Sequence, residues 1–100
     1  MDVLEELKTL CRELGEEGLI PRIESFVSLN RELESKKGKE FVDAAILGFA
    51  EGILTTLRLR HPGDGRVEKL LERVSTRRKE LDMMFRKPKP PIFEEPQSKV

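Results

Sequence analysis

Hydrophobic residues recur every three or four positions along most of this chain, and glycine and proline interrupt the repeat at a few places. Residues 2–14 place six apolar side chains on one face, and Gly15 stands where a helix commonly ends. A second run follows Pro21, which suits the first turn of a helix, and continues to about Ser35. The pattern predicts two amphipathic helices in this part of the chain.

The stretch from Glu40 to Arg60 is apolar on nearly every side of a helix. At 100° per residue, with Phe41 at zero, an apolar arc runs from about 0° to 180° and is expected to face the core. The arc holds Phe41, Val42, Ala45, Ile46, Phe49, Ala50, Ile53 and Leu57. A second strip, between about 300° and 20°, has small side chains and predicts that a neighbouring backbone approaches closely. The strip holds Ala44, Gly48, Gly52 and Thr55.

Two leucines interrupt the narrow polar arc of the same helix. Leu47 and Leu54 lie at about 240° and 220°. The polar residues of that arc are Asp43, Glu51 and Arg58. A helix covered on only one side has no reason to place two leucines there. The pattern therefore predicts that these five residues form an interface, either in a homodimer or with a helix of a partner protein.

The segment from His61 to Gly65 breaks the pattern with one proline and two glycines, and a fourth helix of about 20 residues follows it. The proline-rich sequence at 87–91 cannot continue that helix. Residues 87–100 are predicted to form an extended Pro-rich tail, in which Ile92 and Phe93 are expected to dock on the helices or on a partner. Short connections predict an all-α fold, a four-helix antiparallel up-down bundle over residues 1–86.

Basic residues line one side of the fourth helix. Arg66, Lys69, Arg73 and Arg77 share a strip beside the apolar face, and like charges at this spacing repel one another. An anionic partner would relieve the repulsion, so nucleic acid is a possible ligand of this strip. Acidic residues also lie nearby, at Glu68, Glu72 and Glu80, and no aromatic residue accompanies the strip for base stacking. A solvated helix face is the alternative.

Composition narrows the class of protein. The 19 basic and 19 acidic residues balance, but residues 1–50 are net acidic and residues 51–100 net basic. The single Cys11 falls on an apolar face and favours a reducing compartment. The first residues lack a signal-peptide pattern, and no stretch is apolar enough to span a bilayer, so we expect a cytoplasmic protein without a membrane partner. The abundance of Glu, Arg and Lys is typical of thermophilic proteins.

Candidate chemistry is sparse. Glu13 and Glu16, with Glu40 and Asp43, have a spacing that resembles the paired acids of the MazG-type nucleotide pyrophosphatases, which hold Mg²⁺ between helices. The resemblance covers only these four residues, and an intervening helix is expected to place the two pairs at opposite ends of the bundle. His61 and Cys11 make neither a zinc site nor a catalytic pair. We therefore expect no cofactor, metal or catalytic residue.

The sequence thus favours a small non-enzymatic protein-protein interaction module that self-associates through the helix at residues 40–60. The alternative is a nucleic-acid-binding accessory protein that uses the basic strip.

Overall fold

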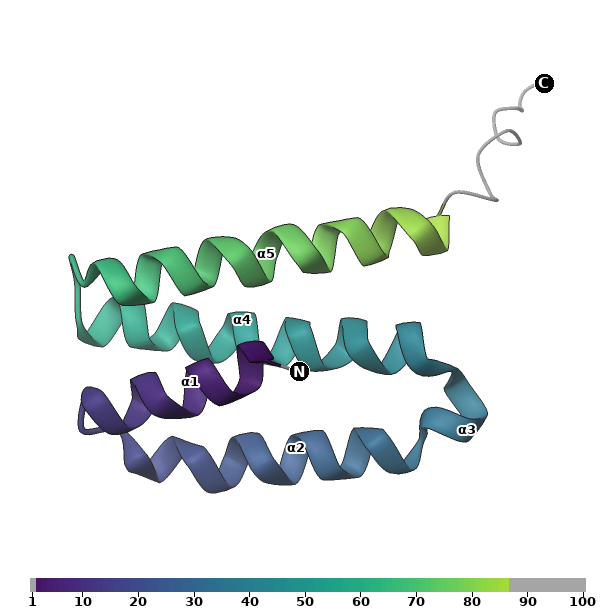
Figure 1. Cartoon of the computed structure of the whole chain (residues 1–100), viewed down its shortest axis with the longest axis horizontal. Helices are drawn as coiled ribbons and strands as arrows, with labels where there is room; N and C mark the ends of the chain where they lie inside the picture. Colours follow the sequence, from purple (N-terminus) through teal and green to yellow (C-terminus); the bar gives the residue numbers. More distant parts are fainter. Residues whose placement is uncertain (1, 87–100) are drawn as a thin grey trace.

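The computed structural model describes residues 2–86, and all regular structure within that range is helical (Figure 1). The elements are α1 (Asp2–Glu13), a 3-10 turn η1 (Glu17–Leu19), α2 (Ile20–Glu32), α3 (Glu34–Lys37), α4 (Lys39–Arg60) and α5 (Gly65–Arg86). The predicted all-α class is confirmed, and α3 is a short helix that the sequence pattern did not indicate. The predicted tail at 87–100, with Ile92 and Phe93, lies outside the described residues.

The four longer helices run in alternating directions, joined by short connections (Figure 1). Helix α4 lies between α2 and α5 and contacts both of them. Helix α1 packs against α2, α4 and α5, but its 12 residues reach along only part of the 22-residue α4 (Figure 1). Helix α4 is therefore covered by three other helices and is the element on which the core is assembled.

Glycine ends α1 as the sequence predicts. Gly15 has a positive φ of 73°, and the N–H of Glu16 donates to the carbonyl of Cys11 at 2.7 Å. This pairing satisfies a carbonyl that the last turn of the helix would otherwise leave without a partner. At the start of α5, the Asp64 carboxylate accepts the backbone N–H of Arg66 at 2.9 Å and caps that helix.

The core side of α4 differs from the predicted arc. Its buried residues are Val42, Ile46, Leu47, Ala50, Ile53, Leu54 and Leu57. These positions span about 100° to 240° on the helical wheel, so the core side is turned away from Phe41, which is 47% exposed. Phe26 of α2 stacks on Phe49 at 4.2 Å between ring centroids, and this contact marks the α2 side of α4.

The predicted interface at Leu47 and Leu54 is wrong, because both side chains are completely buried inside the chain. They lie close on the helical wheel to Glu51, whose carboxylate accepts hydrogen bonds from Ser75 and Arg78 of α5. That side of α4 therefore faces α5. The second packing partner that the two leucines indicated is another helix of the same chain.

We predict that Leu47→Ala and Leu54→Ala each lower the free energy of unfolding by about 2–5 kcal/mol, because each leaves a cavity in a packed core. Met83→Ala is the matched control, since Met83 on α5 is 71% exposed and its truncation should cost less than about 0.5 kcal/mol. Urea denaturation of the three variants measures both effects. A leucine variant as stable as wild type would contradict its buried position.

Candidate association surface

The polar residues of the predicted interface mostly form contacts within the chain. Asp43 pairs with Arg31 of α2 at 3.0 Å and with Lys39 at 2.8 Å. Burial raises the pKa of Asp43, but the hydrogen bond from Lys39 and the positive charge of Arg31 outweigh that effect, so the pKa lies below its ordinary value. The pKa of Glu51 is also lowered, first by the hydrogen bond from Ser75 and then by that from Arg78.

Arg58 is the member of the predicted interface that is exposed. Asp43 and Glu51 are half-buried and join α4 to its neighbours, and the two leucines belong to the core. The five residues are therefore not brought together as one surface.

The basic strip of α5 faces the acidic side of α1. Arg73 donates to both carboxylate oxygens of Glu6, at 2.6 and 3.0 Å, and this hydrogen bonding lowers the pKa of Glu6. Arg66 pairs with Glu13 at 3.0 Å as well as with Asp64 at 2.8 Å. The basic strip indicated an anionic partner, and α1 of the same chain supplies much of that negative charge.

A shallow groove of about 450 Å³ separates the two charged rows. Its charged lining residues are Glu5, Glu6 and Glu13 from α1, and Arg66, Lys69 and Arg73 from α5. Arg77, the last member of the strip, lies beyond this groove and pairs with Glu80 at 3.2 Å. The opposite charges of the two halves of the chain therefore meet between α1 and α5.

The two acidic pairs lie at opposite ends of α4, as expected. Glu16 accepts hydrogen bonds from Arg60 at 2.7 Å and interacts with the His61 ring nitrogen at 2.8 Å, beside the C-terminal end of α4. Asp43 lies near the other end, about 27 Å away along the axis at 1.5 Å per residue. Within residues 2–86, no group of three His, Cys, Asp or Glu side chains is placed to hold a metal ion.

The side of α4 opposite the core holds exposed and half-buried residues but no fully buried one. We call this side the outer face of α4. It comprises Phe41, Ala44, Ala45, Gly48, Gly52, Thr55, Thr56 and Leu59. Leu59 is 77% exposed, although it is a large apolar residue. Phe41 and Leu59 are five helical turns apart, so they share one angle on the helix.

The glycines of the outer face are not required by packing inside the chain. A Cβ atom added at Gly52 would meet no atom within 4 Å, and one added at Gly48 would meet only the Arg78 side chain at 3.7 Å. The close helix crossing predicted at these small residues is therefore not made at Gly52 within the described chain, and at Gly48 the neighbour is the Arg78 side chain of α5. Of the four residues in the predicted strip, Gly52 is exposed, and Ala44, Gly48 and Thr55 are half-buried.

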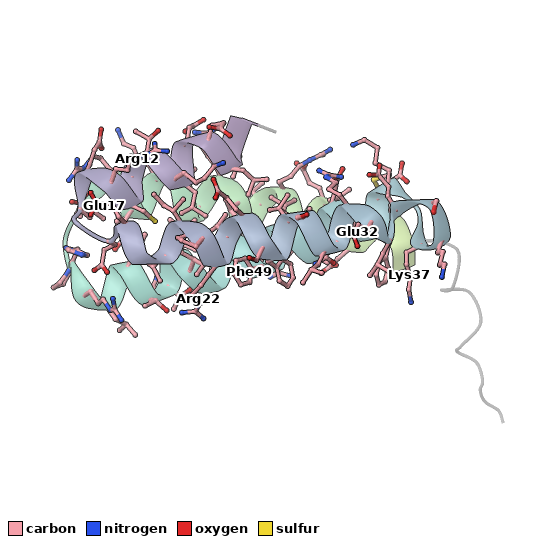
Figure 2. All side chains as sticks on the ribbon, turned by 90° about the horizontal axis from the view of Figure 1, so that it is seen from below. Arg12, Glu17, Arg22, Glu32, Lys37 and Phe49 are labelled. Carbon is pink, nitrogen blue, oxygen red and sulfur yellow. The ribbon has the colours of Figure 1, made fainter. Side chains whose placement is uncertain are left out.

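A groove and an apolar ridge lie beside the outer face, on its α2 side. The groove, of about 280 Å³, is lined by Arg22 and by α4 residues that include Phe49, Gly52 and Thr56. Figure 2 shows Arg22 and Phe49 on the same side of α2. Leu29 and Leu33 are 62% and 41% exposed, and they follow Phe26 at positions i+3 and i+7 of the chain. This spacing places them on the side of α2 that meets α4.

Comparison with known proteins identifies a similar solved structure and the family of this chain. The crystal structure of a singleton protein, PF1176 from P. furiosus, is similar over 82% of this chain and 89% of that chain, with 44% sequence identity and a TM-score of 0.78. The chain belongs to the family described as "Protein of unknown function (DUF3216)", which matches residues 4–95. No curated protein matches. No helix within residues 2–86 is long and apolar enough to cross a membrane.

We predict that Arg73→Glu lowers the melting temperature, because it places a like charge against Glu6 of α1. Glu6→Arg alone should do the same, and the double variant should recover much of the loss by restoring an ion pair in the reverse sense. Thermal unfolding of the three variants at low and high salt measures the coupling, which should weaken as salt rises. No recovery in the double variant would contradict the contact between α1 and α5.

A second prediction concerns the cap of α5. The hydrogen bond from the Arg66 side chain lowers the pKa of Asp64 from 3.8 to about 2. Stability from the ionised carboxylate is therefore present above pH 3.8 and is lost as the pH falls through about 2. Asp64→Asn keeps a capping side chain but removes the charge. Its melting temperature should lie below that of wild type at pH 7, and the difference should close near pH 2. A difference independent of pH would contradict this assignment.

Proposed function

We propose that this protein is a non-enzymatic helical interaction module that self-associates through α4, its central helix. The contact surface is the outer face of α4, not the side that carries Leu47 and Leu54. The observation that carries the proposal is the pair Gly48 and Gly52, because packing within the described chain leaves room for a Cβ atom at both positions. They lie between two exposed large apolar residues, Phe41 and Leu59.

The energetics of α4 support this use of the face. Each glycine in the middle of a helix costs roughly 1 kcal/mol relative to alanine. No contact inside the described chain compensates for Gly52, around which space is open. A helix from another molecule could approach closely at these positions, because no side chain holds it away. Such an approach would also bury Phe41 and Leu59, with a gain of about 1.5–3 kcal/mol for each side chain that is fully removed from water.

A second copy of this chain is the partner that the face fits best. The outer face has a small centre and a large apolar residue at either end, so it presents the same pattern when read in either direction. A surface of this kind is complementary to itself, as the two-fold contact of a homodimer requires. The proposal therefore commits to a homodimer, the commonest closed assembly of identical chains.

Nucleic-acid binding through the basic strip stays an untested alternative. Arg66 and Arg73 are held by carboxylates of α1, and an anionic ligand would have to compete with those carboxylates. We therefore take self-association as the function that the geometry supports best.

We predict that wild type sediments as a dimer at high protein concentration and that Gly52→Arg sediments as a monomer. The arginine fills the space that a second helix needs, yet it favours the helix by about 0.5–1 kcal/mol over glycine, so the fold is retained. Circular dichroism checks the retained helix content. The matched control is Thr76→Arg, which adds the same charge at an exposed site on α5, in a groove that also contains Val3 of α1. A monomeric wild type, or a dimeric Gly52→Arg, would overturn the proposal.

A further inference from the structure

We infer that two copies pair with their α4 helices antiparallel, about a two-fold axis level with residue 50. This register rests on the proposed self-association and specifies its geometry. In an antiparallel pair centred there, two residues, one from each copy, lie at the same level when their residue numbers add up to about 100. Phe41 then lies level with Leu59, and Gly48 with Gly52, in both halves of the contact.

The chemistry of the outer face repeats about that centre. Besides the two pairs already named, Ala45 lies level with Thr55, and Ala44 with Thr56. Small residues therefore meet small residues over the middle of the crossing, and a large apolar pair closes each end. All of these positions lie within about 60° of the line through Phe41 and Leu59, with Gly48 and Gly52 about 20° on either side of it, so they are on the side of α4 that faces the other copy.

The surface beside α4 is also complementary to itself about this two-fold axis. Helix α2 runs antiparallel to α4, and the Phe26–Phe49 stack fixes their relative position. This places the exposed Leu29 and Leu33 beside the first half of α4, whereas the 280 Å³ groove at Gly52 lies beside the second half. A two-fold axis at residue 50 brings the ridge of one copy against the groove of the other, and it does so twice.

Charge selects the antiparallel arrangement over the parallel one. Glu40 and Arg58 are both exposed, lie at the same angle on α4, and stand on opposite sides of residue 50. Antiparallel pairing brings Glu40 of one copy to nearly the same level as Arg58 of the other, on the same side of the contact. Parallel pairing would put each of these charges level with its own copy but on opposite sides of the contact, so no pair of opposite charges would form.

Cross-linking between cysteines decides the register. Ala45 and Thr55 are half-buried residues of the outer face, and cysteine is close to both in size. We expect a short bismaleimide to link a mixture of the Ala45→Cys and Thr55→Cys proteins into heterodimers. Each variant alone should link poorly, because identical positions are about 15 Å apart along antiparallel helices at 1.5 Å per residue. Wild type is the control, since its only cysteine, Cys11, is fully buried.

The outcomes separate the register from the function. Efficient links between identical variants, with no heterodimers in the mixture, would show a parallel dimer, which overturns the register and leaves self-association through α4 standing. A dimer in sedimentation without any links would place the contact elsewhere and overturn both. A charge exchange gives an independent check: Arg58→Glu should weaken the dimer several-fold, and Glu40→Arg in the same chain should restore it. Weakening without restoration would also overturn the antiparallel register.

Discussion

The burial of α4 is the constraint on which the rest of the structure depends. This helix is apolar on most of its circumference, so a single neighbour cannot cover it. Helix α2 takes the side marked by Phe49, α5 takes the side marked by Glu51, and the shorter α1 closes the structure over part of its length. Each of the other three long helices therefore packs an apolar face against α4 and exposes a charged face to water. What remains on α4 is the outer face, on which Phe41, Gly52 and Leu59 are exposed.

Charge completes the arrangement that burial begins. The first half of the chain is acidic and the second half basic, and the fold sets the acidic side of α1 against the basic side of α5. Ion pairs this exposed contribute little individually, but pairs such as Glu6–Arg73 favour one orientation of α1 over others. A basic strip that would repel itself on an isolated helix is thus compensated within the molecule. The charge asymmetry reflects the contact between two helices as much as any external ligand.

The sequence determined the helices well because their signals are local. The 3.6-residue period, Gly15 and the break at His61 give the bounds of the long helices to within a few residues. The sequence could not determine which neighbour covers which side, because that depends on how α2 and α5 approach α4. The pattern predicts that Leu47 and Leu54 need a packing partner, but it does not say whether the partner belongs to the same chain. The helical wheel predicts Phe41 in the core because it shows only which positions are apolar, and the observed core is centred about half a turn away.

On the outer face of α4, neither helix propensity nor packing within the single chain explains the residues that are present. Natural helices favour residues such as alanine at exposed interior positions, and replacing Gly52 by alanine would meet no obstruction in this fold. A glycine kept at such a position lowers the stability of the helix without any benefit to the single chain. The same glycine becomes favourable when a second backbone must pass close by, because the lost helix propensity is then offset by contacts along the whole crossing. The exposed Phe41 and Leu59 follow the same logic, since both are unfavourable in water and favourable in a contact between copies.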